Sequence, residues 1–364
     1  MNKGIRQIKV DLAERSYAIL LGENILPECV AGLKEFCREE EVFLVSDTLV
    51  YGYYGKELER LLAQEGYRAV TYLIEPGESS KSWAVAEKIL DYMLEKNLSR
   101  KTPLLALGGG VVGDLTGFVA ALYRRGVPLI QIPTTLLAQV DSSVGGKVAV
   151  NHPHGKNMLG TFYQPRAVWA DLCTLETLNL REWRAGLAEV LKYALLWDKE
   201  FFVYLEEQAE QILQKNPSVL LAVIERCIRI KAEIVQQDER DEGLRNVLNL
   251  GHTIGHALEK ATDFQQYRHG EAVAIGLRAV FKLAEKMGMI TQEGRQRVEE
   301  LMQTWGLPLT LPAAVLADVL GLLKFDKKVE GKELLFILPV ELGKVAVQKG
   351  IGEEVVEQVL QEML

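Results

Sequence analysis

Three of the five histidines in the chain lie close together in its second half. Asn249, His252 and His256 fall in the segment Leu-Asn-Leu-Gly-His-Thr-Ile-Gly-His, and His269 follows at the head of the next apolar segment. The spacing predicts that the first three side chains share one stripe of a helix. Imidazole is the commonest metal ligand among side chains. The cluster therefore predicts a metal site, with histidines that only pack helices together as the alternative.

A carboxylate that could complete such a site occurs earlier in the chain. Glu189 and Lys192 stand three residues apart, so they share one face of a predicted helix, and both interrupt an apolar stripe that should be buried. One carboxylate and two imidazoles form the ligand set of many catalytic zinc sites. The spacing leaves open which two histidines bind, and a Glu–Lys pair on the surface is the alternative. The metalloprotease motif His-Glu-x-x-His does not occur, which excludes that reading.

The first half contains a glycine turn that could bind a diphosphate. An apolar run at 104–107 leads into Gly-Gly-Gly-Val-Val-Gly-Asp at 108–114, which predicts a strand, a tight turn and the start of a helix. Backbone N–H groups at such a helix start favour anions. The motif is a weak dinucleotide fingerprint because it does not lie in the first βαβ unit, and a plain strand-to-helix turn is the alternative. Asp47, after the run 42–45, is expected either to accept ribose hydroxyls or to cap a helix.

Several loops carry groups that could hold phosphate or carboxylate oxygens. Hydroxyl groups follow the run 129–132 at Thr134 and Thr135, and lysines stand on glycine-containing loops at Lys147 and Lys156. The segment Asp-Ser-Ser-Val-Gly-Gly-Lys at 141–147 is not a Walker loop, because Asp141 replaces the upstream glycine and no Ser or Thr follows the lysine. Each loop alone is equally typical of a turn or a helix cap.

Composition excludes some classes of partner and location. The net charge is -8 and no basic block stands out, so nucleic acid is not an expected partner. The most apolar long run, 104–123, is broken by three glycines and by Asp114, so we expect no membrane span. Residues 1–20 contain no continuous apolar segment of the kind that a secretory signal needs. Four dispersed cysteines fit a reducing compartment, so a cytoplasmic protein is expected.

The order of elements predicts two domains. In residues 1–179, short β-branched runs alternate with amphipathic stretches, which predicts an α/β domain with a mainly parallel, Rossmann-like sheet. Residues 180–364 are expected to form a mainly α-helical domain that binds metal and substrate. Its predicted helices cover 181–197, 201–214, 217–237, 244–261, 271–287 and 353–363, and a short strand is predicted at 334–338.

Seven motifs occur in an order that closely resembles the 3-dehydroquinate synthase family. The resemblance covers about residues 47–328 and is far more specific than any single glycine loop. The motifs are Pro-Gly-Glu-x-x-Lys at 76–81, Gly-Gly-Gly-Val-Val-Gly-Asp at 108–114, Pro-Thr-Thr-Leu-Leu-Ala-Gln-Val-Asp at 133–141, Gly-Lys-Asn at 155–157, Ala-Glu-Val-Leu-Lys-Tyr at 188–193, Asn-Leu-Gly-His-Thr-Ile-Gly-His at 249–256 and His-Gly-Glu at 269–271.

The resemblance implies a homodimeric enzyme of the shikimate pathway that depends on NAD and Zn²⁺, with Co²⁺ as a substitute ion. Such a lyase converts 3-deoxy-D-arabino-heptulosonate 7-phosphate, a small phosphorylated sugar acid, to 3-dehydroquinate and phosphate. The implied sequence is transient oxidation by NAD, phosphate elimination, re-reduction, ring opening and intramolecular aldol closure. NAD is regenerated in each turnover.

The resemblance also assigns residues to roles. It implies that Glu189, His252 and His269 bind the metal, whereas His256 contacts substrate. The substrate residues that it implies are Lys147, Lys192, Arg245, Asn249, His256, Asp141, Asn157, Arg125, which would reach the phosphate across a dimer interface, and Lys328, with Lys327 as the alternative lysine. The residues that it implies for NAD are Asp47, Pro76, Gly77, Glu78, Ser79, Ser80, Lys81, Gly110, Val111, Val112, Gly113, Asp114, Thr134, Thr135, Lys147, Lys156, Thr174, Leu175, Glu176 and Thr177.

Three rival functions remain to be weighed. Another sugar-phosphate cyclase would share the motifs and differ in its sugar. A metal-dependent NAD polyol dehydrogenase would release NADH and needs no phosphate site, so the lysine loops and Arg125 favour the cyclase. A non-catalytic NAD-binding scaffold predicts a lost ligand or lysine, and the sequence lacks neither.

Overall fold

The computed structural model describes residues 4–37, 39–330 and 335–364, without the side chains of 325–330. The chain forms two compact units, described separately below. Unit 1 contains Met1–Asn179 and Leu220–Arg240, and unit 2 contains Leu180–Val219 and Asp241–Leu364. The predicted boundary after residue 179 coincides with the end of the first segment, but residues 220–240, which we had assigned to the helical half, pack with unit 1. The functional assignment of the two domains stays a prediction.

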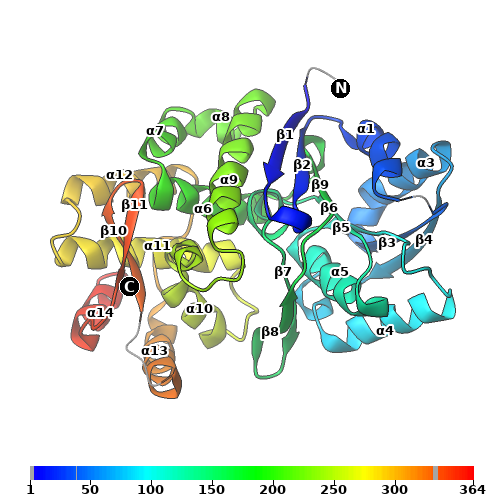
Figure 1. Cartoon of the computed structure of the whole chain (residues 1–364). Helices are drawn as coiled ribbons and strands as arrows, with labels where there is room; N and C mark the ends of the chain where they lie inside the picture. Colours follow the sequence, from blue (N-terminus) through cyan, green and yellow to red (C-terminus); the bar gives the residue numbers. More distant parts are fainter. Residues whose placement is uncertain (1–3, 38, 331–334) are drawn as a thin grey trace. The chain divides into compact units, whose positions relative to one another are not determined.

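Unit 1 is built on a seven-stranded sheet with the order β1-β2-β9-β6-β5-β3-β4 (Figure 1). Every neighbouring pair is parallel except β1 and β2. This sheet confirms the predicted mainly parallel α/β architecture. The strands are β1 (Arg6–Val10), β2 (Tyr17–Gly22), β3 (Glu41–Asp47), β4 (Arg68–Ile74), β5 (Leu104–Gly108), β6 (Leu129–Pro133) and β9 (Ala167–Asp171).

Apolar side chains on both faces of the sheet explain its helical cover. In β3, Phe43 and Val45 pack in one cluster with α4 and α5, whereas Val42 and Leu44 pack in another with α1 and α3. Figure 1 shows where these helices lie around the sheet. A strand buried on both faces reads as a continuous apolar run, which is why the run 42–45 was recognisable. The helices of unit 1 are α1 (Leu26–Ala31), α2 (Thr48–Val50), α3 (Lys56–Gln64), α4 (Trp83–Glu95), α5 (Gly110–Leu122) and most of α9 (Pro217–Gln237).

A β-hairpin was missed by the sequence analysis. β7 (Lys147–His152) pairs antiparallel with β8 (Gly155–Phe162), where we had expected glycine-softened loops. β7 packs against α5 through Val148, whose side chain lies where a Cβ on Gly117 would be. Because β8 is exposed over most of its length, it carries no apolar alternation that would have revealed it. The hairpin places Lys147 at its start and Lys156 just after its turn.

Unit 2 is mainly helical, as predicted. Its helices are α6 (Leu180–Trp197), α7 (Lys199–Glu207), α8 (Ala209–Leu213), α10 (His252–Ala261), α11 (His269–Lys286), α12 (Gln292–Thr304), α13 (Leu316–Glu330) and α14 (Glu353–Gln361). A small antiparallel sheet pairs β10 (Phe336–Glu341) with β11 (Lys344–Gln348). Among the described residues, no helix combines the length and the apolar character that crossing a bilayer requires.

Two predicted helices are divided in the structure. The expected helix 244–261 is a 3₁₀ helix, η8 (Leu244–Asn249), followed by α10, because Gly251 takes the left-handed conformation with φ 79°. The prediction that Asn249 shares a helical stripe with His252 is therefore wrong. The expected helix 201–214 ends at Glu207 and resumes at Ala209, since Gln208 leaves helical geometry with ψ 11°.

Glycines let three helices of unit 2 approach closely. A Cβ on Gly276 of α11 would lie 1.9 Å from the carbonyl oxygen of Gly251, and one on Gly270 would lie 1.9 Å from the carbonyl oxygen of Ala185 in α6. Real Cβ atoms do not approach oxygen so closely, so both positions require glycine. The close packing brings the N-terminal ends of α10 and α11 towards the middle of α6.

Candidate metal centre

Glu189 is a completely buried carboxylate near the middle of α6. Its side chain is 0% exposed, and its Oε2 lies 2.5 Å from Nζ of Lys192, which is itself 2% exposed. Burial of a charge is costly unless an opposite charge accompanies it. The expectation of buried charge on this apolar face is confirmed, and the alternative of a surface Glu–Lys pair is wrong.

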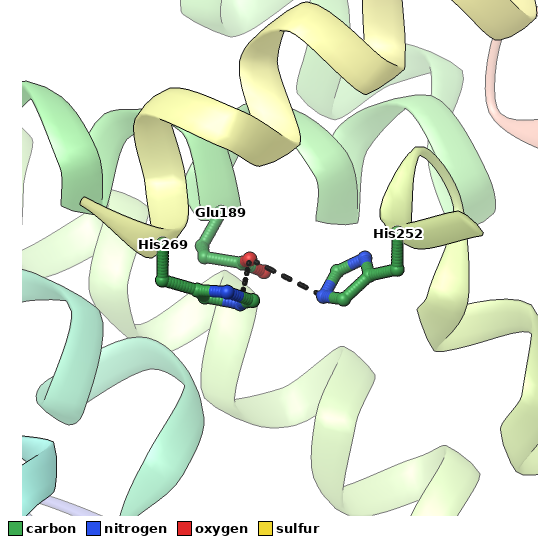
Figure 2. Close-up of side chains that lie close together, drawn as sticks. All are labelled: Glu189, His252 and His269. Atoms are coloured by element: carbon green, nitrogen blue, oxygen red, sulfur yellow. Dashed lines mark ion pairs between the residues drawn. The ribbon is translucent and has the colours of Figure 1, made fainter. Parts of the chain in front are cut away.

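Two histidines present the same ring nitrogen to this carboxylate. Nε2 of His252, at the first residue of α10, lies 3.7 Å from Oε1 of Glu189, and Nε2 of His269, at the first residue of α11, lies 3.5 Å from the same oxygen. Figure 2 shows the Glu189 carboxylate close to both rings, with a dashed line from it to a nitrogen of each ring. Three side chains from three helices thus converge on one point.

The outer nitrogen of each ring also has an oxygen partner. Nδ1 of His252 lies 3.1 Å from the carbonyl oxygen of Leu250, and Nδ1 of His269 lies 3.3 Å from Oε2 of Glu259. Metal-binding histidines characteristically donate a hydrogen bond from the N–H of their second ring nitrogen to a carbonyl or carboxylate oxygen, which fixes the ring and its tautomer. Both rings therefore have the outer contacts that such ligands use.

The two rings differ in their acid–base behaviour. Burial, and next the ammonium of Lys192, lower the pKa of His252 to about 3, so this ring is neutral at physiological pH. Burial also disfavours charge on His269, but its hydrogen bonds with Glu189 and Glu259 outweigh that effect and raise its pKa to about 10. A metal bound between the rings requires both imidazoles in the neutral form.

The donor set fits a divalent transition metal. One donor atom from each of Glu189, His252 and His269 lies within 4.8 Å of the others. Two nitrogens and one carboxylate oxygen leave a further position open to water or substrate, as in catalytic zinc sites. His256, Glu259 and His269 form a second group that meets the same distance limit. The choice of the first group as the ligand set stays a prediction.

The other predicted residues of unit 2 lie on neighbouring elements. The ring of His256 is exposed, with its centroid 5.2 Å from that of His252 and 5.9 Å from that of His269. Arg245 is 2% exposed in η8, whereas Asn249, at the end of η8, is exposed. Lys327 and Lys328 belong to α13, but their side chains lie outside the part of the chain that the structure describes.

In unit 1, the predicted NAD residues follow the carboxyl ends of neighbouring parallel strands. Asp47 ends β3, the loop 76–81 follows β4, Gly110 begins α5 after β5, and Thr134 follows β6. Ligands of open α/β sheets bind at this edge. Thr174, Leu175, Glu176 and Thr177 follow β9 in the same way, and Thr177 lies 2.6 Å from the hydroxyl of Tyr54. The structure brings these segments to one edge, while their contact with NAD stays a prediction.

Asp47 has the capping role that we had considered as the alternative. Its Oδ1 accepts a hydrogen bond from the backbone N–H of Val50 at 2.8 Å, and burial raises the pKa of its carboxyl. The cap uses one oxygen of the carboxylate, and a carboxylate has further acceptor sites. Capping α2 and accepting a ribose hydroxyl are therefore compatible.

Lys81 links the loop 76–81 to two other predicted residues. Its Nζ lies 2.5 Å from Oδ2 of Asp114 on α5 and 2.6 Å from Oδ1 of Asn157 on β8, and the side chain is almost fully buried. Glu78 of the same loop accepts a hydrogen bond from Asn151. The loop, the helix start and the hairpin are thus joined by polar contacts within unit 1.

One charged residue next to a predicted site was missed. Nζ of Lys231, on α9, donates to the backbone oxygen of Asp141 at 2.6 Å and to its Oδ1 at 2.8 Å. Lys231 is 5% exposed on a helix face that is otherwise apolar. A lysine inside an apolar stripe was the signal available in the sequence, the same signal that identified Lys192.

The remaining cations lie at the surface of unit 1. Lys147 begins β7 and is exposed, and Lys156 is half-buried on β8. Arg125 is exposed in the turn after α5 and has a left-handed backbone with φ 65°. Exposure leaves these groups able to meet an anion, and the contacts that the resemblance implies for them stay predictions.

Comparison with known families accounts for most of the chain. Residues 71–185 match the model described as 3-dehydroquinate synthase N-terminal, and residues 186–329 match that described as 3-dehydroquinate synthase C-terminal. The 3-dehydroquinate synthase of Thermodesulfovibrio yellowstonii is 45% identical, over 98% of this chain and 100% of that protein. That of Desulforamulus reducens is 46% identical, over 98% of this chain and 99% of that protein.

Solved structures with the same fold include related cyclases and a dehydrogenase. The 2-epi-5-epi-valiolone synthase of Streptomyces hygroscopicus, determined with NAD⁺ and Zn²⁺ bound, superposes with a TM-score of 0.89 at 30% identity, covering 97% of this chain and 98% of that one. A 2-deoxy-scyllo-inosose synthase complexed with carbaglucose-6-phosphate, NAD⁺ and Co²⁺ gives a TM-score of 0.89 at 25% identity, covering 99% and 100%. A probable glycerol dehydrogenase of Sinorhizobium meliloti shares the fold at 15% identity and a TM-score of 0.65.

Proposed function

Because the chain belongs to the 3-dehydroquinate synthase family, we propose that it acts as that lyase, forming 3-dehydroquinate and phosphate from 3-deoxy-D-arabino-heptulosonate 7-phosphate. The observation that carries the proposal is the convergence of Glu189, His252 and His269 on one point of unit 2. A sugar with adjacent hydroxyl groups can bind to a metal held there. The relatives' names and near-complete coverage support the choice of reaction.

Glu189, His252 and His269 would hold Zn²⁺, or Co²⁺ in its place. The NAD⁺ and Zn²⁺ of the valiolone synthase and the NAD⁺ and Co²⁺ of the inosose synthase support this pair of cofactors. When bound, the metal would polarise substrate oxygens, while NAD would take hydride from the substrate and return it within one turnover. In this chain Lys192 holds Oε2 of Glu189, which leaves Oε1 facing the two rings.

Unit 1 would hold the dinucleotide at the carboxyl edge of its sheet. The start of α5 at Gly110 supports this role, because the first N–H groups of a helix favour a diphosphate. A Cβ on Gly113 would lie 2.8 Å from Oε1 of Gln131, so glycine lets α5 lie close to β6. Asp47 would accept ribose hydroxyls with the carboxylate oxygens that its capping role leaves available.

Cationic and amide side chains would orient the substrate. Lys147 and Arg125 would bind the phosphate, and the buried guanidinium of Arg245 or Lys328 would meet the carboxylate of the heptulosonate. His256 would contact the substrate beside the metal site, since its ring is exposed next to those of His252 and His269. Elimination and aldol closure depend on such positioning more than on one strong base, and the departing phosphate can remove the proton itself.

The family resemblance further supports a homodimer in the cytoplasm, in which Arg125 of each protomer would reach the substrate phosphate bound in the other protomer. It also supports residues 1–179 as the NAD-binding domain and 180–364 as the domain for metal and substrate. Size-exclusion chromatography with light scattering tests the dimer. Mixing Arg125→Ala with His269→Ala tests the shared site, because a mixed dimer of these two variants regains one complete site only if Arg125 acts across the interface.

The reaction is tested with protein that has been stripped by a chelator and then supplied with Zn²⁺, catalytic NAD⁺ and the heptulosonate phosphate. We expect inorganic phosphate to appear without net accumulation of NADH. Folded protein that releases no phosphate would reject the reaction. Net NADH formation on glycerol would instead identify a polyol dehydrogenase, and phosphate release only from another sugar phosphate would identify a different cyclase.

A further inference from the structure

Glu259 is a buried carboxylate on the outer side of the predicted metal site. Its side chain is 1% exposed, two helical turns after His252 on α10. Residues seven apart lie on the same face of a helix, and Gly255, which packs closely against Ala272 of α11, lies between them on this face. The face of α10 that turns towards α11 therefore carries both a predicted ligand and a second carboxylate.

The ring of His269 bridges two carboxylates. Its Nε2 lies 3.5 Å from Oε1 of Glu189, and its Nδ1 lies 3.3 Å from Oε2 of Glu259. The ring of His252 has the same orientation, with Nε2 towards Glu189 and Nδ1 on the carbonyl oxygen of Leu250. Both rings thus point Nε2 inward and anchor Nδ1 outward, but only His269 is anchored by a carboxylate.

We propose that Glu259 is a positioning residue that orients His269 as a metal ligand and strengthens its donation. An ionised carboxylate only accepts hydrogen bonds, so Nδ1–H of His269 donates to Glu259, and in the neutral ring that a metal requires, the lone pair of Nε2 lies on the side of Glu189. A carboxylate behind a metal-bound imidazole fixes the ring and raises its basicity. This inference rests on the proposed function, because it takes Glu189, His252 and His269 as the ligands.

The geometry opposes a role for Glu259 as a ligand beside His269. The 3.3 Å between Nδ1 of His269 and Oε2 of Glu259 suits a hydrogen bond, and the third member of that group, His256, is exposed, whereas Glu189 and His252 on the Nε2 side of the ring are both buried. When Nδ1 of His269 is hydrogen-bonded to Glu259, only Nε2 of this ring can bind an ion. The group His256, Glu259 and His269 is thus better explained as an outer shell of the site at Glu189.

The test measures metal affinity of the full chain without substrate or NAD. Zn²⁺ binding is titrated against a chromophoric chelator for wild type and Glu259→Gln, and the visible absorption of the Co²⁺ forms is recorded. Glu285→Gln is the matched control. Glu285 lies on the same helix as His269 but sixteen residues after it, and its carboxylate pairs with Arg295 at 2.5 Å. Glu259→Asp, which keeps the buried charge, serves if the Gln variant does not fold.

We expect Glu259→Gln to bind Zn²⁺ about 10–100-fold more weakly than wild type, with the Co²⁺ spectrum retained and Glu285→Gln unchanged. Glu259→Asp should recover part of the loss. Equal affinity of Glu259→Gln and wild type would overturn the inference alone. A Co²⁺ spectrum that shows a lost ligand in Glu259→Gln would also overturn it, since Glu259 would then bind the ion itself. Failure of wild type to bind Zn²⁺ would contradict both this inference and the proposed function.

Discussion

Glu189 and Lys192 form an ion pair with 2.5 Å between Oε2 and Nζ in a part of α6 where both side chains are almost completely buried. The pair explains how an apolar helix face can keep a carboxylate ready for a metal ion. The ammonium balances the charge when the metal is absent, and the other carboxylate oxygen faces the two imidazole rings. The same lysine helps to keep His252 neutral, as the lowered pKa of that ring shows.

Removing the ammonium should destabilise the metal-free protein. Lys192→Met keeps the aliphatic stem but takes the opposite charge away from a buried carboxylate, which costs about 3 kcal/mol in comparable buried pairs. Urea unfolding in the presence of a chelator measures the loss. The double variant Glu189→Gln with Lys192→Met should lose less than the sum of the single variants. Strictly additive losses would show that the two side chains do not interact.

The two histidines of α10 should differ in their effect on metal content. His252→Ala removes a predicted ligand and should leave much less than one equivalent of zinc after dialysis, whereas His256→Ala should keep the ion and lose activity. Elemental analysis of the purified variants measures this difference. Both variants keep α10, because alanine is a strong helix former. Zinc loss in His256→Ala with retention in His252→Ala would reverse the assignment.

The approach of α10 to α11 should depend on Gly276. Gly276→Ala would place a Cβ 1.9 Å from the carbonyl oxygen of Gly251, so the helices must separate and the variant should lose about 3 kcal/mol of unfolding free energy. Its zinc affinity should fall as well, because His252 and His269 lie on the two helices. Gly321→Ala, on α13 with open space around the glycine, is the control and should be neutral or slightly stabilising. Equal behaviour of the two variants would contradict the packing argument.

The start of α11 should be sensitive to acid. Burial raises the pKa of Glu271, but hydrogen bonds from Arg181 and from the backbone of Arg268 outweigh it and hold the pKa below the ordinary value of 4.5. A lowered folded-state pKa contributes stability above the unfolded-state pKa, and the contribution disappears as pH falls through the folded-state value. The pair is half exposed on the arginine side, so Glu271→Gln should cost only about 0.5 kcal/mol at pH 7.

Denaturant unfolding of wild type and Glu271→Gln between pH 7 and pH 3.5 measures the effect. The difference in unfolding free energy should shrink as the pH falls below the ordinary glutamate pKa. Arg181→Met should reproduce the loss at pH 7 and add little to Glu271→Gln. A difference that grows with acidity would have the wrong sign for a carboxylate stabilised in its ionised form.

The sheet was predictable because its strands are buried on both faces. Continuous apolar runs at 42–45 and 129–132 identified β3 and β6 to within a few residues of their ends. The β7–β8 hairpin was not predictable, since β8 is exposed and its glycines indicate loops. The break at Gly251 was not predicted either. A glycine within a helical pattern of apolar residues does not reveal a left-handed backbone, and the close contact with Gly276 is visible only in the fold.

The cluster of Glu189, His252 and His269 was predictable from its residue types, but spacing did not show which histidines lie beside the carboxylate. The four-residue spacing placed His252 and His256 on one helix face and suggested that both bind the metal. Only the family resemblance indicated His269 as a ligand in place of His256. Lys231 and Glu259 were overlooked, although each is a charged residue on an otherwise apolar helix face. Their contacts with Asp141 and His269 join elements far apart in sequence, and periodicity within one helix carries no such information.

The position of the metal tests the account most directly. Crystals of the full chain grown with Zn²⁺ should show one anomalous difference peak at the zinc edge, within about 2.0–2.2 Å of Nε2 of His252, Nε2 of His269 and a carboxylate oxygen of Glu189. A peak held by His256, Glu259 and His269, or fully loaded crystals without a peak at either group, would contradict it.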